Sequence, residues 1–314
     1  MRVVIAGGTG FLGRALASAL GADGHDLVIL TRGTVPKTNA TRPRFVAWWP
    51  NGDAGPWAAE VDGAGAVVNL AGESIAAKRW TKAQKQRILE SRIKATTSLT
   101  WAIRCAVSPP PVLVSGSAVG YYGPLGREII NEQAPPGDDF LATVCSRWEE
   151  EAYHAVSDRT RVVCVRTGLV LEKGGGALPE IARPFSFGAG GPVGSGKQYW
   201  PWIHRDDWVA LVKWIIDTPA VTGAVNGTAP SPVTNAEFAK TLGREIHRPA
   251  FMPAPGFALR LILGEMAQGL LLSGQRAVPA KAESMGFLFR YRRLDDALHA
   301  IYGEKGRDSK QQSI

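Results

Sequence analysis

The stretch RVVIAGGTGFLGRALASAL, residues 2–20, decides the fold of this chain. Residues 3–6 are apolar and mostly β-branched, which is typical of a buried strand. A turn containing Gly7, Gly10 and Gly13 follows at once, and the residues after it predict a helix. A strand, a glycine turn and a helix in this order predict the phosphate-binding start of a dinucleotide-binding βαβ unit. The alternative is an ordinary strand-loop-helix connection with spare glycines.

Each glycine of the turn has its own physical role. Gly7 allows a sharp turn out of the strand, Gly10 lets the backbone approach a pyrophosphate, and Gly13 lets the helix pack closely on the strand. The N-terminus of the helix adds free N–H groups and the positive end of the helix dipole. We therefore predict cofactor contacts at Gly7, Thr9, Gly10, Phe11, Leu12 and Gly13.

The end of the next apolar run predicts which dinucleotide binds. Residues 26–30 read as the second strand, and Thr31 and Arg32 follow it. An enzyme that uses NAD places an acidic residue here to bond the ribose 2′-hydroxyl, but no acid occurs between Asp26 and Asp53. A guanidinium can bond a 2′-phosphate bidentately. Thr31 and Arg32 therefore predict NADP rather than NAD, the alternative being that Arg32 is a plain surface charge.

Strand-like and helical stretches alternate along the first half of the chain. Besides the two strands above, apolar runs predict strands at residues 44–49, 66–72, 112–115 and 161–166, and residues 81–106 and 138–154 predict long helices. This alternation predicts an α/β fold, a Rossmann-type doubly wound parallel sheet with helices on both faces.

The same pattern suggests a division into domains. Residues 1–171, with residues 205–228 returning to them, are assigned to an NADP-binding Rossmann domain. Residues 172–204 and 229–303 are assigned to a smaller substrate domain, and residues 304–314 to a flexible tail. In the returning segment, Asp206 is predicted to cap the helix that follows it, and the neighbouring His204 is predicted to be structural.

Composition narrows the classes of protein and partner. The chain has 314 residues with 45% hydrophobic and 20% charged residues, which suits a globular protein. No apolar run approaches the ~18 residues of a membrane span, and Met1 leads directly into a strand, so we expect a cytoplasmic protein that contacts no membrane. Its three cysteines lack metal-ligand spacing, so no metal site is expected. The net charge of +8 is densest in the helix at residues 81–106. Without a nucleic-acid motif, we expect a solvated face there, part of it turned to an anionic cofactor.

Several motifs resemble the extended branch of the short-chain dehydrogenases/reductases. The glycine turn and the segment Asn69-Leu70-Ala71-Gly72 match its cofactor-binding motifs, and residues 116–123, Gly-Ser-Ala-Val-Gly-Tyr-Tyr-Gly, match its serine loop with one residue added. Together with Pro201-Trp202-Ile203-His204, these motifs are most similar to atypical NAD-dependent epimerase/dehydratase-like proteins, described as sugar-nucleotide epimerases, which carry a C-terminal domain of unknown function.

This resemblance covers the chain to about Tyr302 and extends the predicted site. It implies that Asn69, Leu70, Ala71 and Gly72 pass beneath the cofactor and that Ser117 is the catalytic serine. Arg166 belongs to the motif that closes the nucleotide domain, and it is included among the cofactor contacts. Arg92 is expected to help hold the phosphate side.

The family's usual catalytic pair is missing. Typical members use Tyr-x-x-x-Lys, but none of the six tyrosines has a lysine four residues later. Alignment on Glu149 puts Leu141 at the tyrosine position and Cys145 at the lysine position. Tyr121 or Tyr122, just after Ser117, could replace the proton donor if a neighbouring cation is present, the nicotinamide ring of NADP⁺ being the candidate. The alternative is that both tyrosines only wall an apolar pocket.

Three functions therefore stay open. The first is an NADP-dependent oxidoreductase or epimerase acting on a small molecule, for which a sugar nucleotide is one candidate. The second is an NADP(H)-binding sensor or scaffold without turnover, and the third is a nucleic-acid-binding protein that uses the basic helix. The resemblance also implies a homodimer formed through residues 81–106 and 138–154.

Overall fold

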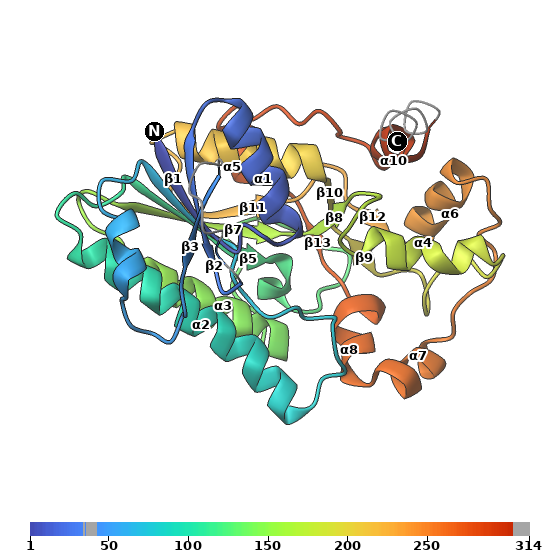
Figure 1. Ribbon diagram of the computed structural model, residues 1–314. Helices are drawn as coiled ribbons and strands as arrows, with labels where there is room; N and C mark the ends of the chain where they lie inside the picture. Colours follow the sequence, from blue (N-terminus) through green and yellow to red (C-terminus); the bar gives the residue numbers. More distant parts are fainter. Residues whose placement is uncertain (34, 36–42, 304–314) are drawn as a thin grey trace. The chain divides into compact units, whose positions relative to one another are not determined.

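A computed structural model describes residues 1–33, 35 and 43–303 of the chain. Its centre is a seven-stranded sheet in the order β11-β7-β5-β4-β1-β2-β3 (Figure 1). The strands are β1 (Arg2–Ala6), β2 (Asp26–Thr31), β3 (Arg44–Ala47), β4 (Ala66–Asn69), β5 (Val112–Ala118), β7 (Arg161–Thr167) and β11 (Gly223–Gly227). β1 pairs in parallel with β2 and β4, as do β2 with β3 and β4 with β5. The predicted doubly wound parallel sheet is confirmed, and its strand order reverses between β1 and β4.

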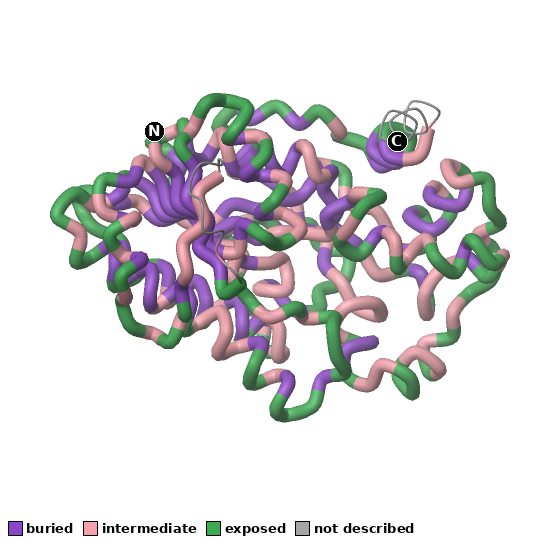
Figure 2. Tube along the Cα trace, in the orientation of Figure 1, coloured by how far each residue is buried: buried purple, intermediate pink, exposed green. Residues whose placement is uncertain are grey.

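Helices cover both faces of this sheet. The helices α1 (Phe11–Ala22) and α5 (Arg205–Asp217) lie on one face, and α2 (Lys82–Cys105) and α3 (Phe140–Tyr153) lie on the other (Figure 1). Apart from the edge strand β3, the strands are buried along most of their length, as Figure 2 shows, because both faces are covered.

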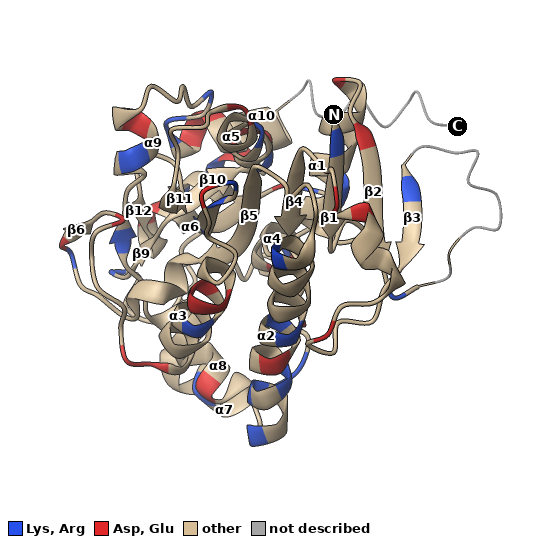
Figure 3. Ribbon diagram, turned by 90° about the vertical axis from the view of Figure 1, so that its left-hand side faces the viewer, with Lys and Arg blue, Asp and Glu red and all other residues tan. Residues whose placement is uncertain are grey.

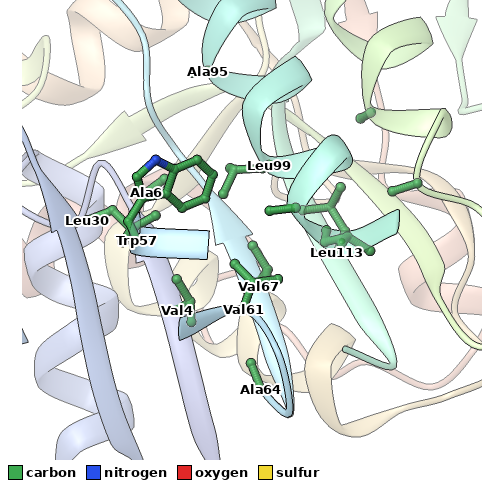
Figure 4. Packing of buried hydrophobic residues seen from close by; sticks show 14 of the residues in the cluster. Val4, Ala6, Leu30, Trp57, Val61, Ala64, Val67, Ala95, Leu99 and Leu113 are labelled. Carbon is green, nitrogen blue, oxygen red and sulfur yellow. The ribbon is translucent and has the colours of Figure 1, made fainter. Parts of the chain in front are cut away.

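A continuous hydrophobic core lies between the sheet and α2. Trp57 of the 3₁₀ helix η1 (Pro56–Glu60) packs with Val67 of β4 and Leu99 of α2 (Figure 4). Burial of such side chains is the main stabilising contribution to the sheet–helix packing, about 1.5–3 kcal/mol for each large one.

Arg161 ties β7 to the end of α5. Its guanidinium donates to the carbonyl oxygens of Ile215 (2.7 Å), Ile216 (3.1 Å) and Val221 (2.8 Å). These carbonyls lie at and just beyond the C-terminus of α5, where a helix has unsatisfied acceptors and its dipole favours a cation. The last part of the sheet therefore depends on a segment much later in the chain.

The chain divides into two compact units. The first contains residues 1–121, 143–166 and 209–225, and the second contains residues 122–142, 167–208 and those from 226 onward. The second unit thus includes residues 122–142, which the sequence placed in the nucleotide domain. The reason is pairing: β6 (Ile129–Ile130) pairs with β13 (Arg276–Ala277), and Glu132 accepts hydrogen bonds from the backbone N–H groups of Asn226 and Lys281. The predicted tail, residues 304–314, lies outside the described residues.

The second unit is built from short strand pairs and helices. The parallel pair β8 (Leu169–Leu171) and β10 (Trp202–His204) and the antiparallel pair β9 (Tyr199–Trp200) and β12 (Val233–Thr234) belong to it. Its helices are η2 (Val119–Tyr122, which ends in it), α4 (Leu178–Ser186), α6 (Asn235–Glu245), α7 (Gly256–Leu263), α8 (Glu265–Ala267), η3 (Gln268–Leu272), α9 (Ala280–Ser284) and α10 (Leu294–Tyr302). Trp202, Phe238 and Leu298 lie in its own core.

The start of α5 corrects a predicted cap. The backbone N–H of Asp206 donates to Nδ1 of the buried His204 (3.1 Å), so His204 rather than Asp206 is the capping side chain. The His204 ring packs 4.0 Å from the ring of Tyr291. Burial lowers the pKa of His204, which keeps Nδ1 unprotonated as an acceptor. The predicted structural role of His204 is thus explained by capping and packing.

Candidate functional site

The glycine turn between β1 and α1 has the shape of a phosphate cradle. Gly7 has φ +79°, and a Cβ placed on it would lie 2.6 Å from the carbonyl oxygen of Leu70. A Cβ on Gly13 would overlap the carbonyl oxygen of Gly7. Gly10 stands at the N-cap of α1, has no side chain to cap the helix, and no acidic residue occupies the first turn. Neither a cap side chain nor a carboxylate of the first turn therefore competes for the N–H groups at this helix end.

The end of β2 presents a cation and no acid. Thr31 is buried and accepts a hydrogen bond from the backbone N–H of Gly33 (3.0 Å). Arg32 is exposed, and in residues 1–33, 35 and 43–303 it has no hydrogen-bond or ion-pair partner. A guanidinium held at the strand end is suited to a phosphate at this position.

The loop after β4 is shaped by Asn69. This fully buried amide donates to Oγ1 of Thr96 (2.9 Å) and accepts from the backbone N–H of Ala71 (3.2 Å). The backbone N–H of Leu70 donates to the carbonyl oxygen of Ala6 (2.8 Å), which holds this loop against the end of β1. The two loops meet where the strand order reverses, the position at which open α/β sheets bind ligands.

Arg92 braces the same loop from α2. Its Nη1 donates to the carbonyl oxygens of Glu73 (3.0 Å) and Ile88 (2.9 Å), and its guanidinium lies 5.1 Å from the ring of Trp148. Burial lowers the pKa of Arg92, and a Cβ on Gly72 would lie 3.1 Å from its Cζ. The structure thus places Arg92 beside the predicted Asn69–Gly72 loop, and its role toward a phosphate stays a prediction.

Ser117 belongs to a buried cluster that the sequence did not predict. It lies within β5, not in the loop after it, and its Oγ donates to Oε1 of Glu149 on α3 (2.6 Å). Arg166 of β7 forms two parallel hydrogen bonds with the same carboxylate, both 2.8 Å long. The guanidinium carbon of Arg166 lies 3.4 Å from the ring centroid of Tyr121. We call Ser117, Tyr121, Glu149 and Arg166 the serine–arginine cluster.

This cluster changes the interpretation of two predicted residues. Arg166 was expected to contact cofactor, but two of its nitrogens bind Glu149, so the structure places it in an internal ion pair. A cation does lie over the Tyr121 ring, but it is Arg166, whose charge is already paired with Glu149. Glu149 was used only to align the helix, and its burial next to an arginine from another strand carries no signal in the local sequence.

Tyr122 offers no exposed proton donor. Neither do Leu141 and Cys145, the residues of α3 that align with the family's tyrosine and lysine. The Tyr122 ring is 1% exposed, and its hydroxyl donates to Oδ1 of Asn226 (2.7 Å) inside the second unit. Cys145 is buried, and that burial raises the pKa of its thiol to about 12. Of the two tyrosines proposed as donors, only Tyr121 is partly exposed, and it borders a cavity of about 420 Å³ together with Glu149 and Tyr153.

The basic helix α2 is only partly a solvated face. Figure 3 shows Lys and Arg on several of its turns. Lys94 pairs with Glu90 (3.1 Å), and Arg87 binds Gln84 on the same helix, whereas Arg92 turns inward. The predicted dimer through α2 and α3 stays a prediction.

Two classes of site find no support in the described part of the chain. Residues 1–33, 35 and 43–303 contain no cluster of three His, Cys, Asp or Glu side chains that could hold a metal ion. Within the same residues, no helix is long and apolar enough to cross a membrane.

Comparison with known families agrees with this geometry. Residues 3–226 match the NAD-dependent epimerase/dehydratase family, and residues 254–301 match a domain of unknown function, DUF1731. The chain belongs to the NAD-dependent epimerase/dehydratase family, as its motifs predicted.

Particular relatives extend over nearly the whole chain. The chloroplastic homologue of epimerase family protein SDR39U1 from Arabidopsis thaliana is 42% identical over 96% of this chain and 86% of its own length. The crystal structure of human SDR39U1 with NADPH has 37% identity and a TM-score of 0.88, covering 97% of this chain and all of that one. A nucleoside-diphosphate sugar epimerase from Corynebacterium glutamicum has 30% identity and a TM-score of 0.77, covering 100% of this chain and 61% of its own.

Proposed function

We propose that this protein binds NADP(H) along the carboxyl ends of β1, β2 and β4. The observation that carries the proposal is the combination of a glycine cradle at the uncapped start of α1 with an exposed Arg32 where an acid would select NAD. The human relative, whose structure contains NADPH, supports it. The residues proposed to hold the cofactor are Gly7, Thr9, Gly10, Phe11, Leu12, Gly13, Thr31, Arg32, Asn69, Leu70, Ala71 and Gly72, with Arg92 behind the last loop.

Arg32→Asp tests the cofactor. It sets a carboxylate against the 2′-phosphate and removes charge-assisted bonds of about 1.5–3 kcal/mol each, so NADPH affinity should fall at least tenfold. Titration followed by NADPH fluorescence measures this, with Arg104→Asp as a control that makes the same charge change on an exposed residue near the end of α2. Unchanged NADPH affinity in Arg32→Asp, or a preference of the wild type for NADH, would contradict the assignment.

We further propose that the protein is an oxidoreductase or epimerase acting on a small molecule. When bound, NADP(H) would supply the hydride acceptor or donor. Ser117, whose own proton is donated to Glu149, would accept a hydrogen bond from a substrate hydroxyl, and Tyr121, beside Arg166, would move the proton. The name of the Corynebacterium relative supports a sugar nucleotide as the first substrate class to test.

A non-catalytic NADP(H)-binding role is the second candidate, and a specific observation favours it. Leu141 and the neutral, buried Cys145 stand where the family's tyrosine and lysine are expected, and Tyr122 is enclosed. A screen of sugar nucleotides and carbonyl compounds separates the two roles if NADPH absorbance is read for net oxidation or reduction and the products are separated by chromatography to detect epimerisation, which leaves the amount of NADPH unchanged. With a substrate found, Ser117→Ala and Tyr121→Phe should each lower kcat; if both variants keep the wild-type kcat, the proton is moved elsewhere.

A further inference from the structure

The helix α7 and the segment before it display large apolar side chains on the second unit. The exposed fractions are 75% for Phe251, 50% for Met252, 74% for Phe257, 78% for Leu261 and 66% for Ile262. We call these five residues the apolar patch. None of the eight residues of α7 is buried, whereas α6 and α10 of the same unit each bury four or more residues. An apolar surface of this kind marks a contact site for a partner or a membrane.

The arrangement of side chains on α7 is that of a helix lying in an interface. Phe257 and Leu261 are four residues apart and share one side of the helix, with Ile262 on one flank and Arg260 on the other. A wide apolar face bordered by a cation suits a helix that lies in the plane of a lipid headgroup region. At about 1.5 Å per residue, α7 is far too short to span a bilayer.

The patch is held firmly by the backbone around it. The N–H of Met252 donates to the carbonyl oxygen of Gly190 (3.0 Å). The N–H of Gly194 donates to the carbonyl oxygen of Ala254 (2.9 Å). After α7, the short helix α8 buries Met266 and Ala267. The exposed side chains are therefore presented on an anchored segment.

A basic cavity adjoins the apolar patch. It has a volume of about 350 Å³, and Arg127, Lys197 and Leu272 are among its lining residues. A Cβ on Gly256, the first residue of α7, would lie 3.3 Å from Leu272, which links the cavity to the helix. Arg127 and Lys197 are exposed, and neither has an ion-pair partner within the described residues.

The wider segment is also basic. Residues 240–296, which contain the apolar patch, carry nine Lys and Arg against five Asp and Glu, and three of these cations, Arg244, Arg292 and Arg293, form ion pairs within the segment. The nearest acids along the chain, Glu128 beside Arg127 and Glu265 after α7, do not balance the three cations Arg127, Lys197 and Arg260. This surface is therefore positively charged overall and is complementary to an anionic partner.

We propose that this face of the second unit docks on an anionic lipid bilayer, with the apolar patch entering the interface and Arg127, Lys197 and Arg260 contacting lipid phosphates. A second copy of the chain fits less well, because a two-fold interface would bring two copies of the same net-positive surface together. The proposal differs from the sequence expectation of no membrane contact, which rested only on the absence of a spanning segment.

Sedimentation of the full chain with vesicles tests the proposal. Binding is expected to vesicles of phosphatidylcholine that contain phosphatidylglycerol, and weaker binding to phosphatidylcholine alone. Leu261→Asp should lower the partition coefficient at least about tenfold, because the variant has no leucine side chain to transfer from water into the bilayer. The double variant Arg127→Glu, Lys197→Glu should remove the preference for phosphatidylglycerol.

Leu288→Asp is the matched control. Leu288 is 86% exposed in the same unit and lies outside the apolar patch, so its replacement should leave binding unchanged. Circular dichroism of each variant checks the fold. Failure of the wild type to bind either vesicle would overturn the proposal, as would binding that Leu261→Asp does not weaken. Light scattering that shows a dimer dissociated by Leu261→Asp would also overturn it and assign the patch to a second copy.

Discussion

The glycine turn and the serine–arginine cluster both lie in the first unit, but they are encoded in different ways. In the turn, the constraint on Gly13 acts between close neighbours in sequence, since a Cβ there would overlap Gly7, although Gly7 itself also meets the distant Leu70. In the cluster, Glu149 bonds Ser117 across 32 residues and Arg166 across 17. A steric requirement between neighbours restricts residue type, so it is visible in a short motif. Charge neutralisation depends on a distant partner, and no short motif records it.

Removing the buried carboxylate gives the largest effect expected here. Glu149→Gln keeps the shape but leaves the Arg166 charge without its counter-ion, which costs about 3–5 kcal/mol of the free energy of unfolding. Urea unfolding followed by circular dichroism measures the change. Glu150→Gln is the control: Glu150 is the exposed next residue on α3, and its change should stay within about 0.5 kcal/mol. Equal losses of stability in the two variants would show that the Glu149–Arg166 ion pair contributes no more to stability than an exposed carboxylate does.

This contrast explains how much of the site could be predicted. The cofactor turn, the alternation of strands and helices and the missing Tyr-x-x-x-Lys pair follow from local sequence, and so does the acid-free end of β2. Ser117 was found as a residue, but its strand position and its bond to Glu149 were not. Enclosure of Tyr122 depends on Asn226, more than a hundred residues later, so the local sequence could not exclude Tyr122 as a donor.

Two glycines within α1, Gly13 and Gly21, test whether close steric approach constrains the residue type in the glycine turn. Gly13→Ala places a methyl group against Gly7 and Gly8, and such overpacking costs about 1–3 kcal/mol of stability. Gly21→Ala, in the same helix, meets only Leu27 at 3.6 Å and should stabilise by about 0.5–1 kcal/mol through helix propensity. Thermal unfolding of both variants measures the difference. If Gly13→Ala is as stable as Gly21→Ala, the close approach is not a constraint.

The His204 cap of α5 is expected to give the smallest of these effects on stability. Burial lowers the pKa of His204 in the folded state, despite the opposing charges of Asp206, Asp207 and Glu172. The unfolded chain therefore takes up a proton near pH ~6.5 that the folded chain refuses, so stability from this group is complete above that pH and is lost below it.

His204→Asn isolates this contribution, because its amide oxygen can still accept the capping bond but does not titrate. The free energy of unfolding of the wild type should fall more steeply than that of the variant between about pH 7.5 and 5.5. Urea titrations at several pH values measure both slopes. Parallel slopes would show that His204 does not couple folding to protonation in this range.

The first unit is formed by three separate segments of the chain, and this has a consequence for synthesis on the ribosome. Its strand β5 is complete by residue 118, yet β7 and β11, which extend the sheet beyond it, arrive later, and Arg161 finds its carbonyl partners only at residues 215–221. At roughly 5–20 residues per second, β5 remains an open edge for several seconds while the rest is translated. A nascent chain arrested in that interval would expose a long apolar strand without its neighbour, which is the form that chaperones bind and that aggregates recruit.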